Sequence, residues 1–432
     1  MSLRTSAFGR WLSSQNRIML NPTTREDARR LDAEDPIARF RERFRLPEGI
    51  IYLDGNSLGP PPVSATARVT EVLEREWAED LVRSWTSHGW IDLPERVAAT
   101  IASLVGAAPN DIVVADSTSV NLFKLLAAAL RLRPERRVIL SERENFGTDL
   151  YIAQGLADLL GGGFELRLVE RSQLHGALDA DVAVLMLTHV DFRTGLMHDM
   201  PAWTETAHQA GASVLWDLAH SAGAVPVDLR SCGVDLAVGC GYKYLNGGPG
   251  APAFAYVSED LHGKLESPLW GWMGHAEPFE FDTGYRPAEG VARLRVGTPP
   301  ILSLAALERG VEGIAEIGID RLRAKSIAMT ELFMRLVEQE CRGHGFEIVT
   351  PREADRRGSQ VSIRHPQGYA IVQALIAAGV IGDFRDPDIL RFGLAPAYLR
   401  YVDVWDAVEI LRRVMEAESW RRPEYRTRLK VT

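Results

Sequence analysis

Short apolar segments alternate with amphipathic segments along the middle of the chain. Seven runs have the length and composition of buried β-strands: "DIVVAD", "RRVILSE", "FELRLVE", "DVAVLMLTHV", "SVLWDLAH", "VDLAVGCG" and "APAFAYVS". Between them, segments such as "SVNLFKLLAAALRL", "LYIAQGLADLL" and "PAWTETAHQAG" have the spacing of helices. Strands that are apolar throughout and alternate with helices predict an α/β fold, with a mainly parallel seven-stranded sheet that helices cover on both faces.

Helical patterns flank this region, and a second set of strands follows it. Helices are predicted from Ser64 to about Trp85, from Leu93 to Val105, and over a long region from Ser303 to about Glu340. Three short strands and two helices come last, in the segments "FEIVT", "SQVSIRHP", "YAIVQALIAAG", "ILRFGLAP" and "VDVWDAVEILRRVMEA". The end of the chain therefore indicates a smaller α/β unit.

The length of 432 residues exceeds what one hydrophobic core usually organises, so we expect two domains. We place a large domain at residues 51–300 and a small C-terminal domain at residues 301–432. Residues 1–50 are polar and rich in arginine and acidic residues, and form an N-terminal arm. We expect this arm to join the small domain, because the two ends of a chain are often close in space.

Composition and charge narrow the class of protein. The chain is 46% hydrophobic and 25% charged, as in ordinary globular proteins, and its net charge of −9 comes without a basic run that would bind nucleic acid. No apolar stretch has the roughly 20 residues that a membrane span needs. Arg4, Arg10 and Arg17 lie in an acid-free start that loosely resembles a transit peptide, although a surface arm is the favoured interpretation. Three cysteines without metal-ligand spacing fit a reducing cytoplasm.

Polar side chains gather where the predicted strands end. In an open parallel sheet, ligands bind at the carboxyl ends of the strands, so these side chains are candidates for one site. The residues in question are Ser117, Thr118 and Ser119, then Phe146 and Asp149, then Thr188, His189 and Asp191, then Asp217 and His220, and finally Lys243. Five strand ends thus offer hydroxyls at a helix start, an aromatic face, carboxylates, an imidazole and an amine.

This set of groups suits pyridoxal phosphate (PLP), an aromatic aldehyde that carries a phosphate. A desolvated lysine amine such as that of Lys243 forms a Schiff base with the aldehyde. A carboxylate such as Asp217 keeps the ring nitrogen protonated, so that the ring accepts electrons. A helix that begins with hydroxyl residues binds phosphate through its free backbone N–H groups and its dipole.

Each of these residues also has an ordinary structural explanation. An aspartate at a strand end often caps a turn, and Ser-Thr-Ser is a common helix start. A single histidine is often structural, a phenylalanine is often part of the core, and a single lysine is often a surface residue whose stem packs on apolar neighbours. Only the combination, with each group at a different strand end, indicates a cofactor site.

Several motifs carry a resemblance to a known family. The pair "DLAH" (217–220) and "YKYLNGGPG" (242–250) resembles the cofactor signature of the kynureninases, which are fold-type-I (aspartate aminotransferase-like) PLP enzymes. Further matches along the chain are "YLDGNSLGP" (52–60), "RSWTSHGW" (83–90), "DSTSVNLFKLL" (116–126), "NFGTD" (145–149), "GWMGH" (271–275), "YRPAEG" (285–290) and "GTPP" (297–300). The D-x-x-H pattern is shared with cysteine desulfurases, whereas "YLDGNSLGP" together with "GWMGH" is more specific to kynureninases.

The resemblance implies roles for residues of this chain. Lys243 would bind PLP and then move the proton of the substrate Cα, and Asp217 would face the pyridine nitrogen. Tyr242, beside the lysine, is a candidate general acid or base. The other cofactor contacts implied are Phe146 stacked on the ring, Asp149 near Asp217, Thr188 at the ring, His220 beside the cofactor, and Thr118, Ser119, Tyr242, Trp272 and Thr298 at the phosphate, Trp272 and Thr298 acting from the partner subunit of a homodimer.

The resemblance also implies a substrate and a reaction. Arg391, in "ILRFGLAP", would bind the α-carboxylate of L-kynurenine, for which a guanidinium is well suited. Trp85 and Thr298 would lie near the aromatic ring of the substrate, as in bacterial members that favour L-kynurenine over 3-hydroxykynurenine. The reaction would be hydrolysis of the Cβ–Cγ bond to anthranilate and L-alanine, in tryptophan degradation.

Other classes of protein stay open. A cysteine desulfurase or a class V aminotransferase is the nearest alternative, although Cys232, Cys240 and Cys341 lie in no activating pattern. A dinucleotide oxidoreductase is disfavoured because no G-x-G-x-x-G opens a helix. A PLP-binding protein without activity is a further option. Metal catalysis has no support, because the histidines form no H-E-x-x-H motif.

Overall fold

The computed structural model describes residues 24–429, so the arginine-rich start of the chain lies outside the described residues. The chain forms two compact units. The large unit consists of residues 58–192 and 196–316, and the described part of the small unit consists of residues 24–57, 193–195 and 317–429. These divisions lie after Ser57 and Glu316, whereas the domain boundaries expected from the sequence lie at residues 50 and 300.

The large unit is built on a seven-stranded sheet in the order β2-β8-β7-β6-β5-β3-β4. Strand β8 runs antiparallel to both of its neighbours, β2 and β7, and the other four pairings are parallel, as the apolar strand pattern predicts. The strands are β2 (Ile112–Val114), β3 (Val138–Glu142), β4 (Glu165–Val169), β5 (Val182–Thr188), β6 (Ser213–Asp217), β7 (Leu236–Gly239) and β8 (Phe254–Val257). Each coincides with one of the seven predicted strand segments, so the predicted α/β class and sheet are confirmed.

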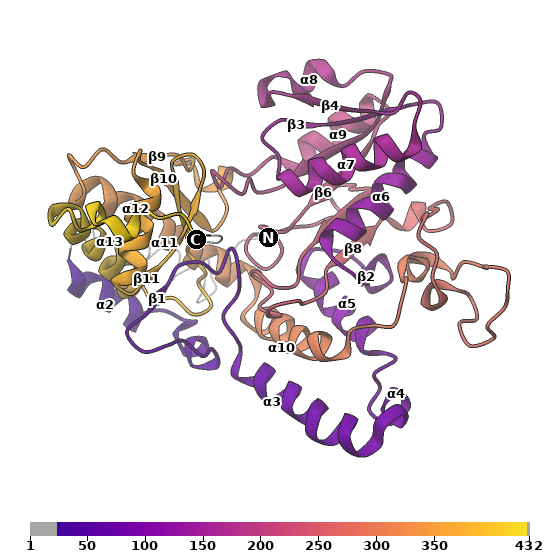
Figure 1. Ribbon diagram of the computed structural model, residues 1–432, viewed down its shortest axis with the longest axis horizontal. Coiled ribbons are helices and arrows are strands. Elements are labelled where there is room, and N and C mark those ends of the chain that lie inside the picture. Colours follow the sequence, from indigo (N-terminus) through magenta and orange to yellow (C-terminus); the bar gives the residue numbers. More distant parts are fainter. Residues whose placement is uncertain (1–23, 430–432) are drawn as a thin grey trace, which may run out of the picture. The chain divides into compact units, whose positions relative to one another are not determined.

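Helices cover the sheet of the large unit (Figure 1). They are α3 (Val63–Glu71), α4 (Ser84–Ser87), α5 (Leu93–Leu104), α6 (Thr118–Leu132), α7 (Gly147–Leu160), α8 (Leu174–Ala177), α9 (Met200–Gln209) and α10 (Ile301–Ile317). Helix α6 packs against α7 and against strands β5, β6, β7 and β8. Its side chains Leu122, Leu125 and Leu126 are fully buried in the central apolar cluster of this unit. The core therefore fixes α6, whose first residues line the candidate site.

Two predicted helices are interrupted. The segment predicted as one helix from Ser64 to Trp85 is α-helical only to Glu71, continues as a π-helix η2 (Val72–Asp80), and then turns through the 3₁₀ segment η3 (Leu81–Arg83). Leu81 has a φ of 54°, which an α-helix does not allow. The long region after Ser303 divides at Gly318, whose φ is 87°, into α10 and α11 (Ile319–Glu340).

The small unit contains a four-stranded antiparallel sheet in the order β12-β13-β10-β9, with helices packed on one another beside it. Its strands are β9 (Glu347–Ile348), β10 (Gln360–Arg364), β12 (Asp383–Arg385) and β13 (Ile389–Gly393), and a separate parallel pair joins β1 (Ile51–Tyr52) to β11 (Val380–Ile381). Its helices are α2 (Arg25–Ala33), α11, α12 (Gly368–Ala377) and α13 (Tyr401–Glu416). The short segments of the chain are η1 (Ala38–Arg43), η4 (Pro109–Asp111), η5 (Arg171–Gln173), η6 (Glu259–Leu261), η7 (Trp272–Gly274), η8 (Gly290–Leu294), η9 (Ala354–Arg356), η10 (Ser419–Arg421) and η11 (Pro423–Tyr425).

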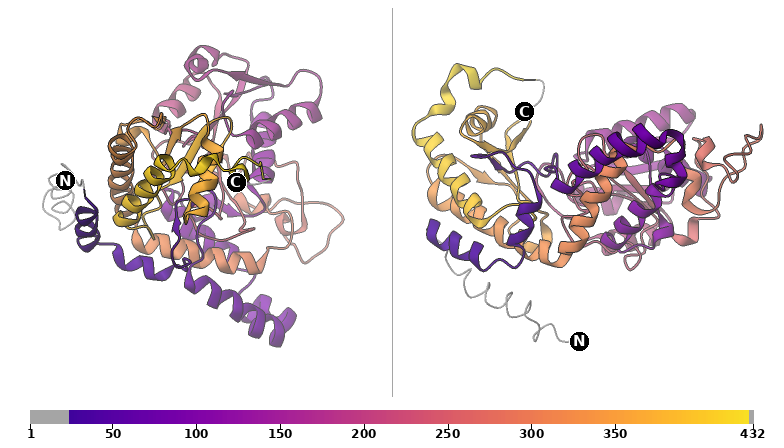
Figure 2. Two further views of the ribbon diagram at one scale, coloured as in Figure 1. Left: turned by 60° about the vertical axis from the view of Figure 1, so that its left-hand side comes forward. Right: turned by 90° about the horizontal axis from the view of Figure 1, so that it is seen from below.

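Helix α2, which the sequence pattern did not predict, joins the two ends of the described chain. It lies beside α13, drawn in indigo and yellow in Figures 1 and 2. The Asp32 carboxylate accepts hydrogen bonds from the backbone N–H groups of Tyr401 and Val402 at 2.6 and 3.1 Å, and so caps the start of α13. Arg25 donates two hydrogen bonds to Asp406, at 2.6 and 2.7 Å.

Among residues 24–429, no helix combines the length and the apolar character that crossing a membrane requires.

Candidate active site

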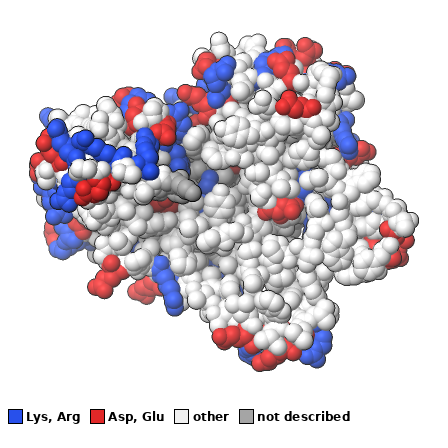
Figure 3. All heavy atoms as spheres, viewed as in Figure 1, with Lys and Arg blue, Asp and Glu red and all other residues white. Residues whose placement is uncertain are grey.

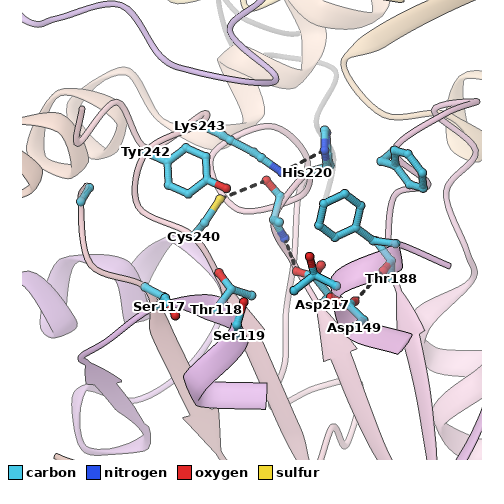
Figure 4. Close-up of a pocket in the computed structure, with 16 residues that line it drawn as sticks. Ser117, Thr118, Ser119, Asp149, Thr188, Asp217, His220, Cys240, Tyr242 and Lys243 are labelled. Atoms are coloured by element: carbon cyan, nitrogen blue, oxygen red, sulfur yellow. Dashed lines mark hydrogen bonds between the residues drawn. The ribbon is translucent and has the colours of Figure 1, made fainter. Parts of the chain in front are cut away.

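A cavity of about 250 Å³ lies in the large unit, where several strands of the sheet end (Figure 4). Strands β5 and β6 end at Thr188 and Asp217, which both line it, and α6 begins beside it. The cavity is lined by Ser117, Thr118, Ser119, Phe146, Thr148, Asp149, Thr188, Phe192, Asp217, Ala219, His220, Cys240, Tyr242, Lys243, Ala251 and Ala253. Its position agrees with the rule that ligands of a parallel sheet bind at the carboxyl ends of its strands.

The start of α6 forms one side of the cavity. The Ser117 hydroxyl caps the helix by accepting a hydrogen bond from the backbone N–H of Val120 at 3.3 Å. Thr118 and Ser119 belong to the first turn, so their hydroxyls and backbone N–H groups lie at the positive end of a 15-residue helix. This side of the cavity is suited to an anion such as a phosphate.

Two carboxyl groups form another side of the cavity. Asp149 and Asp217 are 1% and 3% exposed, and their side chains share a hydrogen bond. Burial, followed by the charge of Asp217, raises the pKa of Asp149 well above its ordinary value. Burial also raises the pKa of Asp217, while Lys243 and the backbone N–H of Ala219 oppose that rise. Two buried carboxylates at contact would repel each other, which is why the Asp217 charge adds to the effect of burial on the pKa of Asp149.

Lys243 reaches into the cavity from the loop after β7. Its Nζ atom lies 3.1 Å from Nε2 of His220, and 5.9 and 5.8 Å from the ring centroids of Phe146 and Tyr242. In Figure 4, the Lys243 and His220 side chains lie above the carboxyl groups and the hydroxyl groups. The amine thus has an imidazole and two aromatic rings as neighbours.

The loop that carries Lys243 is held by close backbone contacts. The backbone N–H of Gly59 donates to the carbonyl of Tyr242 at 2.8 Å. A Cβ atom at Gly59 would lie 2.4 Å from the Lys243 carbonyl and 2.3 Å from Oδ1 of Asn246, so only glycine fits there. The "SLGP" segment and the lysine loop, far apart in the sequence, are therefore in direct contact.

The neighbouring tyrosine and cysteine are held in their neutral forms. Burial raises the pKa of the half-buried Tyr242 phenol, and Cys240 and Asp217 raise it further. Burial likewise raises the pKa of the Cys240 thiol, which is 3% exposed. Tyr242 is therefore a proton donor at neutral pH.

The cavity brings together ten of the predicted site residues and leaves six outside it. The ten are Ser117, Thr118, Ser119, Phe146, Asp149, Thr188, Asp217, His220, Tyr242 and Lys243. Outside it, Trp272 in η7 is 40% exposed, Thr298 is exposed, and Trp85 packs edge-on against Trp90 at 5.8 Å. Arg391 is buried on β13 in the small unit. His189 and Asp191, at the same strand end as Thr188, are buried and do not line the cavity.

Several residues of the lining were not predicted from the sequence patterns. Phe192 follows the end of β5 and meets Phe146 edge-on at 5.1 Å, so the strand-end rule could have found it. Thr148 lies inside the "NFGTD" motif. Ala219 and Cys240 follow the ends of β6 and β7 and line the cavity. No residue pattern in the sequence marks either of them as a lining residue.

The groups of this cavity fit PLP. A helix start with hydroxyls matches a phosphate, a carboxyl pair matches a protonated ring nitrogen, and an amine matches an aldehyde. Each of the three lies on a different element of the large unit, and all of them line the same cavity. The fit thus concerns the three functional groups of PLP at once.

Solved structures define the fold. The chain is similar to an apo cysteine desulfurase from Thermococcus onnurineus NA1, with a TM-score of 0.75 and 20% identity over 88% of this chain and 98% of that chain. It is also similar to C-DES, solved with glycine covalently linked to its PLP cofactor, with a TM-score of 0.74 and 19% identity over 86% and 98% of the two chains. At such identities the likeness concerns the fold alone. The chain has the fold of the fold-type-I PLP enzymes.

Sequence relatives define the family. A family model described as the kynureninase C-terminal domain matches residues 322–411. A kynureninase of Pseudomonas fluorescens is 53% identical over 95% of this chain and its own full length. A kynureninase of Burkholderia mallei (strain SAVP1) is 54% identical over the same share of this chain and its own full length. The chain belongs to the kynureninase family.

Proposed function

We propose that this protein is a PLP-dependent hydrolase that cleaves the Cβ–Cγ bond of L-kynurenine with water and releases anthranilate and L-alanine. Membership of the kynureninase family supports the reaction, and the meeting of Lys243, Asp217 and the start of α6 in one cavity supports the cofactor. The cavity observation is the one on which the residue roles depend. Without it, the three groups would be unrelated structural residues.

The residues of the cavity divide by the part of PLP that each would hold. Thr118 and Ser119 would bind the phosphate at the helix start, and Tyr242 would add a third hydroxyl group to that set. Asp217 would face the ring nitrogen. Asp149 hydrogen-bonds to Asp217 and would support it, and Thr188 Oγ1 in turn lies 3.3 Å from Asp149 Oδ2. Phe146 offers a ring face, and His220 lies beside Lys243.

When bound, PLP supplies an aldehyde that captures amines and a ring that accepts electrons from carbon. Lys243 Nζ would hold the aldehyde group, and its free amine would serve as the base for the proton on the substrate Cα. The Asp217 carboxyl group would keep the ring nitrogen protonated. His220 Nε2, 3.1 Å from Lys243 Nζ, orients the amine.

Tyr242 is the proposed proton donor for the cleaved carbon. Its raised pKa keeps its proton at neutral pH, and its ring lies 5.8 Å from the Lys243 Nζ atom. General acid catalysis of this kind contributes about 10²–10⁴-fold in rate. We expect Tyr242→Phe to retain PLP, judged by its visible absorbance, and to lose turnover by about that factor. Full turnover with bound PLP would remove Tyr242 from the mechanism.

The substrate contacts are proposed from the family motifs. Arg391 would bind the α-carboxylate, because a guanidinium pairs with a carboxylate through two parallel N–H groups. Trp85 and Thr298 would lie at the aromatic ring of the substrate and favour L-kynurenine over 3-hydroxykynurenine. Comparing kcat/KM for the two substrates, in the natural protein and in Trp85→His, measures this preference.

The decisive experiment is an activity assay with purified protein. Incubation with L-kynurenine should release fluorescent anthranilate together with an equal amount of L-alanine, and Lys243→Ala should release neither. Lys264→Ala, at an exposed lysine of the same unit, is the matched control and should keep full activity. Release of sulfide from L-cysteine with no anthranilate from L-kynurenine would contradict the proposal.

The alternative of a cysteine desulfurase is not favoured by the cysteines themselves. A desulfurase needs an accessible thiolate on a mobile loop. Cys341 is 3% exposed, and burial raises its pKa to about 12. Cys240 is equally buried, and burial also raises the pKa of Cys232. None of the three offers a ready nucleophile.

We propose a homodimer in which Trp272 and Thr298 complete the phosphate site of the partner subunit. Both lie outside the cavity of their own chain. The segment around Trp272 exposes large aromatic side chains, which favours burial by another protein surface: Trp270, Trp272, Phe279 and Phe281 are 64%, 40%, 65% and 75% exposed. On the face shown in Figure 3, much of the large unit carries few charged side chains.

We also propose a cytoplasmic location. All three cysteines are free thiols, which is typical of a reducing compartment.

A further inference from the structure

A buried asparagine lies directly behind the cavity of the large unit. Asn145 is 8% exposed and stands between the end of β3 and the start of α7. It does not line the cavity, whereas Phe146 and Thr188, which both contact it, do. A buried amide is unfavourable unless its donors and acceptors are paired, so the partners of Asn145 indicate its role.

The amide oxygen of Asn145 holds two residues of the cavity lining. The backbone N–H of Phe146 donates to Asn145 Oδ1 at 2.7 Å, and Thr188 Oγ1 donates to the same oxygen at 2.5 Å. A backbone N–H can only donate, so the oxygen of the amide, and not its nitrogen, must lie on this side. Both acceptor positions of the oxygen are therefore used by the lining.

The amide nitrogen of Asn145 fixes the other end of the side chain. Its Nδ2 atom donates to Ser141 Oγ at 3.0 Å, and the buried Ser141 hydroxyl donates to the Met186 carbonyl at 2.7 Å. Ser141 and Met186 are paired in the register of β3 and β5. The hydrogen bonds thus leave β5 at Met186 and return to it at Thr188, and the Asn145 side chain cannot rotate without breaking bonds at both ends.

Phe146 depends on this anchor more than a core residue would. It is the N-cap residue of α7, so the hydrogen bond to its N–H fixes the backbone at the point where the helix begins. Its ring is 40% exposed and meets Phe192 edge-on at 5.1 Å. Packing therefore restrains this ring less than it restrains a ring in the core.

We propose that Asn145 is a positioning residue of the cofactor site, which fixes the Phe146 backbone and the Thr188 hydroxyl group before PLP binds. Both residues are proposed contacts of the PLP ring, so the inference rests on the proposed cofactor. Groups that are already fixed in the free protein lose less conformational entropy when the ligand binds. They also hold the ligand in one orientation, because supporting hydrogen bonds restrict their own movement.

The test measures how firmly bound PLP is oriented. PLP is not chiral, so its visible circular dichroism arises from its fixed arrangement in the protein. The ratio of this signal to the visible absorbance reports orientation, independently of turnover and of the amount of PLP bound. In Asn145→Ala the ratio should fall. PLP should also dissociate about 5–100-fold faster, because the Phe146 N–H and the Thr188 hydroxyl group both lose their acceptor.

Two further variants separate positioning from a general loss of stability. Ser141→Ala removes the acceptor of Asn145 Nδ2 without changing a residue of the lining, and should lower the ratio and speed PLP release by only about 2–10-fold. Thr204→Val is the matched control. Thr204 is 1% exposed, accepts a hydrogen bond from Trp216 Nε1 at 3.2 Å and does not line the cavity. Its loss should lower the melting temperature and leave the ratio and the release rate unchanged.

The outcomes are distinct. An unchanged ratio in Asn145→Ala would overturn the inference, and so would an equal fall in Thr204→Val. If Asn145→Ala fails to fold, the ratio in Ser141→Ala decides the question. A protein that shows the expected changes but releases no anthranilate from L-kynurenine would contradict the proposed reaction and leave the positioning role in place. A protein that binds no PLP would contradict both.

Discussion

Among single residues, Gly59 matters to the lysine loop because it has no side chain. The sequence places this glycine in "NSLGP", nearly two hundred residues before Lys243. In the folded chain, a side chain there would collide with the Lys243 carbonyl and with the backbone of Asn246. The motif is therefore a packing requirement of the loop that carries Lys243, and the sequence alone shows it only as a short glycine-proline turn.

Gly59→Ala should therefore displace the lysine loop. Forcing an extra methyl group into a packed site costs about 1–3 kcal/mol, and here the colliding atoms include backbone that cannot rotate away. We expect a lower melting temperature and a large loss of PLP binding, measured by thermal unfolding and by visible absorbance. Gly313→Ala in α10 is the control, since a Cβ atom there meets nothing within 4 Å and alanine favours a helix. Unchanged PLP binding in Gly59→Ala would contradict the expectation.

Among the helices and strands, α6 has its start anchored by a buried lysine. Lys124 is 1% exposed and donates to Asp116, to Oδ1 of Asn121 at 3.3 Å, and to the Leu294 carbonyl at 2.6 Å. Asp116 has a φ of 52° and immediately precedes the helix cap. The lysine thus joins the turn before the proposed phosphate site to η8, in a network that an apolar helix pattern does not predict.

Lys124→Met should loosen this start. The substitution keeps a long apolar side chain but leaves Asp116 and the Leu294 carbonyl without their shared cation. Breaking a fully buried ion pair costs about 3–5 kcal/mol, and the partial exposure of Asp116 lowers that cost. We expect a lower melting temperature and faster loss of PLP on dialysis. Lys264→Met makes the same chemical change at an exposed position and should alter neither. A normal rate of PLP loss in Lys124→Met would show that the network does not support the phosphate site.

For the molecule as a whole, the proposed dimer makes a prediction about mixed subunits. Lys243→Ala and Trp272→Ala should each be poorly active alone. If Trp272 acts in the partner subunit, co-expression produces mixed dimers with one intact site, and about a quarter of the natural activity should return when the subunits pair at random. No recovery would indicate that Trp272 acts within its own chain or not at all.

The stability of the folded protein should also depend on Asp54. Burial, followed by the charge of Asp383, raises the pKa of Asp54 from 3.8 to about 7. The folded state therefore binds more protons than the unfolded state between these values, so the contribution of Asp54 to stability falls as pH rises through this window and is constant above it. Asp54→Asn cannot ionise. The melting temperature of Asp54→Asn should therefore rise relative to that of the natural protein between about pH 4 and about pH 7 and then stay at a constant difference, and parallel profiles across that range would contradict this.

The sheet and most of the cavity could be predicted from the order of the residues. Buried parallel strands must be apolar throughout, so each of the seven was visible as a run of apolar residues. Because such strands end at a common edge, Thr188, Asp217 and Lys243 could be assigned to one site from their positions in the chain. The cap of α6 at Ser117 follows from local chemistry in the same way.

The contacts that join distant segments depend instead on how the chain packs in three dimensions. The interruptions at Leu81 and Gly318, the α2–α13 pairing and the collision that excludes a side chain at Gly59 arise from neighbours far away in the chain. The same holds for the pairing of Asp383 with Arg391, which depends on strand register. Hydrophobic periodicity reports which face of an element is buried, whereas the partner on that face is chosen by packing and by the pairing of buried charges, which no local pattern records.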